Sequence, residues 1–278
     1  MAADKSLIPL GTMIRGGEKT RRSLERFIPI GIESVQIFFW EVLPETADLS
    51  WMEETAAVCR QKGILISALG LYANPLRDLE HRDKAAADWT LLLDFASRFD
   101  IPVVSGFTGR IPGTPLEKSY EGVRDFFTPI TEACLAKNLK LAFENCSMEG
   151  DQSQGDWNIA FLPEVWELLL NDYFPDRNIG LEYEPGHLVR LGIPASEPVR
   201  QWKHRIHHIH GKDAPALFAD EFCFPGEGVS DWPNLLEELK SIQYQGTLDL
   251  EGYHGQFVSH EQEKERQVRS LDYLRTCF

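Results

Sequence analysis

Eight short runs of apolar and β-branched residues recur along the chain, with segments of helical spacing between them. The runs start roughly 25 to 40 residues apart, which is the length of a β-strand with its connecting helix. Eight such alternations favour a closed (β/α)8 TIM barrel. An open doubly wound sheet is the alternative, but no GxGxxG motif follows the first run. The predicted strands are residues 8–14, 34–39, 64–72, 102–109, 139–146, 178–184, 205–213 and 246–253.

The predicted helices occupy the segments between these strands. Segment 49–63 carries the clearest signals, because Ser50 is suited to the N-cap, Glu53 follows three residues later and Gly63 stands where the helix would end. The other predicted helices carry spaced apolar faces and are residues 20–31, 82–100, 117–138, 230–242 and 260–277. With 278 residues, we expect one TIM-barrel domain over residues 1–278.

Composition and charge narrow the class of protein. The formal net charge is −15, whereas a nucleic-acid binder normally gathers Lys and Arg against the phosphates. No stretch approaches the roughly 18 apolar residues of a membrane span, and the N-terminus lacks the pattern of a signal peptide. The five cysteines are dispersed without a CxxC pair, which is typical of reduced thiols. We therefore expect a cytoplasmic enzyme that binds neither nucleic acid nor a membrane.

Ionisable residues stand at the carboxyl ends of four predicted strands, where TIM barrels carry their active sites. Because strand side chains alternate, Glu144 should face the barrel interior, as should Glu184 and Glu251 on later strands. The same alternation turns His210 inward, with Glu182, His208 and Asp249 inward as well but deeper. Three carboxylates and one imidazole should therefore meet at one barrel mouth.

Carboxylates packed this closely repel one another and pay a desolvation cost, so a cation should neutralise them. The single positive charge of Lys212 cannot balance three carboxylates, so a divalent metal ion is the better candidate for this cation. Three carboxylate oxygens and one imidazole nitrogen suit Mn²⁺, Mg²⁺, Co²⁺ or Zn²⁺, and the oxygen majority favours Mn²⁺ or Mg²⁺, with Mn²⁺ expected first. Pro-Gly turns the chain after Glu184, so that His187 should hang over the site beside the metal.

At these four strand ends the sequence resembles the xylose isomerase-like TIM barrels, which include sugar isomerases and epimerases and the AP-endonuclease type. The family pattern is a Glu ending strand five, Asp-x-x-His after strand six, His-x-Lys-Asp at strand seven and a Glu ending strand eight. The matching segments here are AFENC, EPGH, HGKD and LEGY, and PGEGVSDW (225–232) resembles a further family segment. Two departures are Glu184 where Asp is usual, and GKDAPALF without the arginine of some epimerases.

The resemblance implies one metal ion bound by Glu144, Glu184, His210 and Glu251. It also implies that Glu144 and Glu251 form the proton-transfer pair, acting on a hydroxy-ketone through a metal-stabilised enediolate. His187 would hydrogen-bond a substrate oxygen.

Other residues are candidates for the substrate pocket. Lys212 would neutralise charge or form a simple salt bridge. Trp40 and Asn74 lie at strand ends, where they would either line the pocket or structure a loop. Segment 147–161 is long enough for a lid, with Trp157 and Asn158 as sugar contacts. Three more residues are expected to be structural: His208 as a satisfied core histidine, Cys146 as core filler, and Asp213 behind the metal-bound histidine.

Four functions compete. A metal-dependent sugar or sugar-derivative isomerase or epimerase comes first, and a lyase or hydrolase on keto-sugar glycosides could use the same residues. The AP-endonuclease type needs extra histidines for three zinc ions, and ALGLYANP and SGFTGR carry none. A sugar-binding barrel without catalysis would not need two opposed glutamates. We expect a small carbohydrate as the substrate, and a homo-oligomer is compatible with this fold class.

Overall fold

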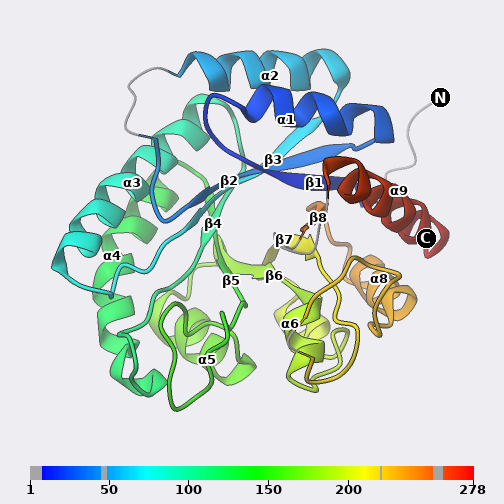
Figure 1. Cartoon of the computed structure of the whole chain (residues 1–278). Helices are drawn as coiled ribbons and strands as arrows, with labels where there is room; N and C mark the ends of the chain where they lie inside the picture. Colours follow the sequence, from blue (N-terminus) through cyan, green and yellow to red (C-terminus); the bar gives the residue numbers. More distant parts are fainter. Residues whose placement is uncertain (1–7, 45–48, 220, 253–258) are drawn as a thin grey trace.

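A computed structural model describes residues 8–44, 49–219, 221–252 and 259–278. Eight parallel strands form a closed barrel in chain order, and helices surround it (Figure 1). The predicted barrel is confirmed. Each strand either lies within its predicted run or extends that run by one residue. Tyr253, the last residue of the eighth predicted run, lies outside the described residues. The strands are β1 (Leu10–Arg15), β2 (Ser34–Trp40), β3 (Leu65–Tyr72), β4 (Val103–Gly106), β5 (Lys140–Glu144), β6 (Ile179–Tyr183), β7 (Ile206–Gly211) and β8 (Leu248–Leu250).

Alternation along the strands separates two interiors. Leu141 and Phe143 of β5 point outward into the large apolar core between barrel and helices, as their spacing predicts. Ala142, between them, packs inside the barrel with Ala68 and Val103. The next inward position along β5, at the carboxyl end of the strand, is Glu144.

The helices connect successive strands on the outside of the barrel. The predicted ones are α1 (Thr20–Phe27) with η1 (Ile28–Ile30), α2 (Ser50–Lys62), α3 (Leu79–Arg98), η2 (Leu116–Lys118) with α4 (Tyr120–Ala136), α8 (Trp232–Ser241) and α9 (His260–Thr276). No helix was predicted for α5 (Pro163–Glu167), the π-helical η3 (Leu168–Tyr173), α6 (Pro185–Arg190) and α7 (Val199–Trp202). Their short length leaves too few turns for a periodic apolar face.

The helix ends show which of the predicted capping residues are correct. Gly63 follows α2 with a φ of 68°, the left-handed conformation that glycine adopts most easily. The prediction for Ser50 is wrong, because Ser50 lies in the first turn and Leu49 occupies the N-cap. Asp78 starts α3 three residues before its predicted beginning, by accepting a hydrogen bond from the backbone N–H of His81. Within the described part of the chain, no helix combines the length and the apolar character needed to cross a bilayer.

Candidate metal centre at the barrel mouth

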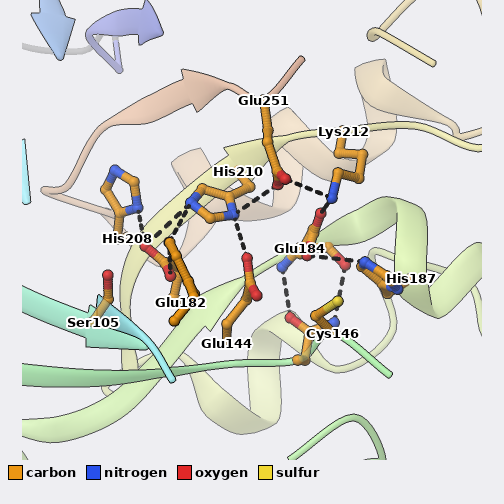
Figure 2. Close-up of polar contacts among 12 residues, drawn as sticks. Ser105, Glu144, Cys146, Glu182, Glu184, His187, His208, His210, Lys212 and Glu251 are labelled. Carbon is orange, nitrogen blue, oxygen red and sulfur yellow. Dashed lines mark hydrogen bonds and ion pairs between the residues drawn. The ribbon is translucent and has the colours of Figure 1, made fainter. Parts of the chain in front are cut away.

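Four side chains from four strand ends meet at the mouth of the barrel (Figure 2). Glu144 ends β5, Glu184 follows β6, His210 lies on β7 and Glu251 follows β8. One ligand atom of each lies within 4.8 Å of those of the other three. The Nδ1 atom of His210 is 2.8 Å from Oε1 of Glu144 and 3.2 Å from Oε2 of Glu251. The structure thus brings together the four residues expected from the sequence.

Backbone contacts fix the strand tip that carries Glu184. The Asn145 side chain donates to the Glu184 carbonyl at 3.0 Å and accepts from the Glu184 N–H at 2.6 Å, which ties β6 to the end of β5. The Gly186 N–H donates to the Lys212 carbonyl at 3.0 Å, which ties the same tip to β7. Pro185 occupies the first turn of α6, where its missing N–H costs nothing. The Pro-Gly pair therefore starts a helix directly above the cluster.

Lys212 is buried within the cluster. Its Nζ lies 2.5 Å from Oε1 of Glu184 and 2.8 Å from Oε1 of Glu251. Burial lowers the pKa of Lys212, but the two carboxylates outweigh burial and raise its pKa well above the usual value. Burial likewise raises the pKa of Glu251, yet Lys212 and His210 together bring it well below the usual value. The lysine is a fixed positive charge of the site.

The donor atoms of the cluster fit a divalent cation. Both carboxylate oxygens of Glu184, Nδ1 of His210 and Oε2 of Glu251 are buried, and none has a well-aligned hydrogen-bond partner among the described residues. Their close contacts are with the other ionisable groups of the cluster, and three carboxylates packed this closely are costly unless a further cation neutralises them. Burial raises the pKa of Glu144 and, well above its usual value, that of Glu184. Hard oxygens with one imidazole are the ligands that Mn²⁺, Mg²⁺, Co²⁺ or Zn²⁺ accept.

The other nitrogen of His210 is held from below. Its Nε2 lies 2.7 Å from Oε1 of Gln36 and 3.2 Å from Oε1 of Glu182. Because both neighbours are acceptors, Nε2 carries a proton that it donates to them. This fixes the ring with Nδ1 directed at the carboxylates, which is how a partner of the second nitrogen orients a metal-binding histidine.

A buried polar layer continues under Glu182. The Nδ1 atom of His208 is 2.9 Å from Glu182, and its Nε2 is 2.7 Å from Asp249. Asp249 in turn accepts hydrogen bonds from Ser34 and Ser67, each at 2.5 Å. His208 is therefore a satisfied core histidine, as predicted. The alternation of side chains predicted that Glu182 and Asp249 face inward, but it did not predict that His208 bridges them.

A cavity of about 410 Å³ opens above the cluster. Four predicted pocket residues line it, namely Trp40, Trp157, His187 and Lys212. Nε2 of His187 is 3.2 Å from Oε2 of Glu184, and the ring packs 4.4 Å from that of Phe222, measured between centroids. Burial lowers the pKa of His187 well below its usual value, so the imidazole is neutral. Sequence reasoning did not single out Phe222 or Arg190, which also line the cavity.

Asn74 does not line this cavity, so the structure supports its loop-structuring alternative. Its amide nitrogen donates to the carbonyls of Arg110 and Asp156 at 2.7 and 2.6 Å. Its amide oxygen accepts from the N–H groups of Leu76 and Arg110 at 2.9 and 3.0 Å. The substrate contact expected for Asn74 is therefore wrong, because every polar atom of the side chain already holds a loop.

Segment 147–161, expected to be a lid, is anchored by buried polar side chains. The Arg110 guanidinium is fully buried and donates to the carbonyls of Asp151 at 2.7 Å and Thr114 at 2.6 Å. Asn158 donates to the carbonyls of Glu144 and Cys146 at 2.8 Å each, so it supports the strand end and does not face a sugar. Arg110 was missed, because a single arginine after β4 carries no sequence signal.

Asp213 and Cys146 were both predicted to have structural roles. Asp213 was expected behind the metal-bound histidine, which is wrong. Its carboxylate accepts from the N–H of Ser230 at 3.0 Å and from Nε1 of Trp232 at 2.8 Å, so it fastens segment 225–232 to β7. Cys146 is buried at the cavity wall, where burial raises the pKa of its thiol well above the usual value. The thiol therefore stays protonated.

Solved structures share this fold at low identity. A xylose isomerase domain protein from Planctomyces limnophilus superposes with a TM-score of 0.74 at 18% identity, covering 97% of each chain. D-psicose 3-epimerase from Clostridium cellulolyticum H10, solved with D-tagatose, has a TM-score of 0.72 at 14% identity, covering 97% of this chain and 99% of that one. The 3-keto-D-glucoside 4-epimerase of E. coli has a TM-score of 0.71 at 17% identity, covering 98% and 100%.

Sequence comparison gives the family directly. No curated protein sequence matches the chain. The model of the xylose isomerase-like TIM barrel matches residues 28–277, nearly the whole barrel and all four residues of the cluster. The chain therefore belongs to the xylose isomerase-like TIM barrel family.

Proposed function

We propose that the protein is a divalent-metal-dependent isomerase or epimerase of a sugar or sugar derivative. The observation that carries this proposal is the cluster of Glu144, Glu184, His210 and Glu251, whose ligand atoms all lie within 4.8 Å of one another. Bound there, a divalent cation would supply the positive charge that polarises a substrate carbonyl and stabilises an enediolate. Mn²⁺ is the ion we expect first, because oxygen ligands predominate.

The residues around the cluster have separate tasks in this proposal. Glu144 ends β5 and Glu251 follows β8, and both approach the same nitrogen of His210. One carboxylate removes the proton beside the substrate carbonyl, and the other returns a proton to the opposite face. Protonation of the opposite face would invert the carbon, and protonation of the neighbouring carbon would isomerise the sugar.

Two further residues complete the site. Lys212 balances part of the negative charge through its contacts with Glu184 and Glu251. The neutral His187 above the cluster offers one nitrogen to a substrate oxygen. Trp40 and Trp157 at the cavity wall exclude water and position the substrate.

The structural neighbours support a carbohydrate substrate. One was solved as D-psicose 3-epimerase with D-tagatose, and another is a 3-keto-D-glucoside 4-epimerase. Both act on a ketone beside a carbon that bears a hydroxyl, which is the chemistry that two carboxylates and one metal ion can serve.

Solvent deuterium exchange tests this function. The protein loaded with Mn²⁺ is incubated in D₂O with a panel of ketoses and keto-glycosides, and mass spectrometry follows deuterium at the carbon beside the carbonyl. We expect exchange in the wild type and its loss in Glu144→Gln and in Glu251→Gln. Glu25→Gln, on the exposed face of α1, is the matched control and should retain it. Exchange that survives both cluster substitutions, or no exchange with any metal, would contradict the proposal. Release of an aglycone together with exchange would identify a lyase or hydrolase instead.

A further inference from the structure

Both oxygens of the Glu184 carboxylate have a close neighbour outside the proposed ligand set (Figure 2). Oε1 lies 2.5 Å from Nζ of Lys212, and Oε2 lies 3.2 Å from Nε2 of His187. The side chains of all three residues are buried, at 5% exposure or less. Each oxygen of Glu184 is therefore directed at a nitrogen that is not expected to bind the metal ion.

The other two carboxylates of the cluster are placed differently. Oε1 of Glu144 and Oε2 of Glu251 face Nδ1 of His210 at 2.8 and 3.2 Å. With these oxygens, both residues can join a cation beside His210 and keep their remaining contacts. Glu184 can join the same cation only if it gives up one of its two neighbours.

Lys212 is the neighbour of Glu184 that gives way more easily. Its ammonium is carried on a flexible four-carbon stem, whereas the ring of His187 packs on Phe222 with 4.4 Å between the centroids. The ammonium also contacts Glu251, so a divalent cation bound to the two carboxylates would repel it at close range. The cation and Lys212 therefore compete for Glu184.

The cavity offers the ammonium a second position. Phe222 lines the cavity, and the centroid of its ring is 4.9 Å from Nζ of Lys212, which is within the range of a cation–π contact. Lys212 lines the same cavity of about 410 Å³, so a rotation of its stem toward the ring ends in open space. There the ammonium would stand beside His187, with N–H groups directed into the cavity.

The length of the Glu184 side chain brings its carboxylate to Lys212. Asp is usual at this position in the family, and its side chain is one methylene group shorter. An aspartate carboxylate would therefore stand farther from the ammonium while it remained a possible ligand. The departure from the family pattern and the contact with Lys212 thus concern the same oxygen atom.

We propose that Lys212 leaves Glu184 when a divalent cation binds there, and that its ammonium turns to the Phe222 ring, where it can donate to a substrate oxygen. This inference rests on the proposed function, since it concerns the metal site of that function. Binding of the cation then completes the ligand set and also presents a positively charged donor to the cavity. Because the two events are linked, Lys212 lowers the affinity for the cation, and the cation makes Lys212 more accessible.

Reductive methylation with formaldehyde, followed by mass spectrometry, measures how accessible the Lys212 amine is. The side chain is 5% exposed and paired with two carboxylates, so we expect slow modification in the chelated protein. Saturation with Mn²⁺ should raise the rate at least about 10-fold, because a minor conformer is populated to about 10% or less before an ion selects it. Lys84 on α3, paired with Asp88 at 2.5 Å, is the internal control, and its rate should not change.

Two variants test the competition from the side of the metal, with Mn²⁺ affinity measured by paramagnetic resonance of the free ion. Lys212→Met removes the competing charge and should bind Mn²⁺ at least about 10-fold more tightly, whereas Lys84→Met should keep the affinity of the wild type. Glu184→Asp retains a carboxylate ligand but withdraws it from the ammonium. In Glu184→Asp the methylation rate of Lys212 should therefore be similar with and without Mn²⁺, which keeps the inference testable should Lys212→Met fold poorly.

A methylation rate of Lys212 that stays constant or falls while Mn²⁺ binds would overturn the inference and leave the metal site standing. Tighter Mn²⁺ binding in Lys212→Met, without a change of methylation in the wild type, would show repulsion without movement and would overturn it as well. Absence of Mn²⁺ binding in the wild type and in both variants would refute the inference together with the proposed function.

Discussion

Removal of a divalent cation from the proposed site should destabilise the fold, because the charges of the cluster would be left unbalanced. The cluster holds three carboxylates, and Lys212 is the cation paired with two of them. Ionised carboxylates therefore exceed the lysine by two charges, which one divalent cation neutralises. Without it, like charges are held together at low dielectric, and some must take up protons or repel.

Because metal binding is linked to folding, the affinity for the metal ion determines how far the melting temperature shifts. A cation that binds only the folded state adds about 2.7 kcal/mol of stability at a concentration 100 times its dissociation constant. In domains of about 150–250 residues each kcal/mol moves the melting temperature by about 2–4 °C, and this chain of 278 residues lies just above that range. Saturation with the correct ion should therefore raise the melting temperature of the chelated protein by about 5–10 °C.

Thermal unfolding by circular dichroism measures this shift. The chelated protein is titrated with Mn²⁺, Mg²⁺, Co²⁺ and Zn²⁺ in turn. Glu184→Gln should abolish the response to metal, because it removes one of the four ligands. Glu25→Gln on the exposed face of α1 should behave as the wild type. An unchanged melting temperature with all four ions, or the same shift in Glu184→Gln, would refute the charge argument.

Substitution of three other buried residues should have measurable effects. Glu182→Gln should weaken Mn²⁺ affinity about 10- to 100-fold by loosening the His210 ring, measured by paramagnetic resonance of free Mn²⁺; unchanged affinity would contradict this. Burial lowers the pKa of His207 from 6.5 to about 3. The stability that the neutral imidazole contributes is therefore fully present above pH 6.5 and is lost as the pH falls toward 3. The wild type should lose about 2 kcal/mol more than His207→Gln between pH 7 and 5 in urea unfolding, and equal losses would refute the assignment. Asp213→Asn should cost about 1–3 kcal/mol in the same assay, because buried donors lose their acceptor, and a neutral result would contradict the contacts described.

The barrel and the cluster could be predicted because both follow from local alternation. Each strand is buried on both faces, so its apolar run stands out between polar helices. The same alternation decides that Glu144 faces inward when Leu141 and Phe143 face the helices. Parallel strands in a closed barrel bring their carboxyl ends together, so inward residues at four ends had to meet.

Contacts between distant segments could not be predicted in the same way. Asn74 binds loop carbonyls at residues 110 and 156, and Asp213 binds Ser230 and Trp232. These side chains look the same in sequence as pocket residues, because a polar residue after a strand can serve either purpose. The choice depends on loop paths that no periodicity encodes. The N-cap prediction for α2 was wrong by one residue, because the helix begins at Ser50 itself and Leu49 is the N-cap.

Metal stoichiometry decides whether the cluster at the barrel mouth binds a divalent ion. Elemental analysis of protein purified without chelator should give about one divalent ion per chain, because the cluster offers a single set of four ligands. Glu144→Gln and His210→Ala should each lose that ion while remaining folded by circular dichroism. About three zinc ions per chain would contradict the single-metal site and favour the nuclease type. No bound metal, even after Mn²⁺ is added back, would contradict both the metal site and the metal-dependent function proposed for it.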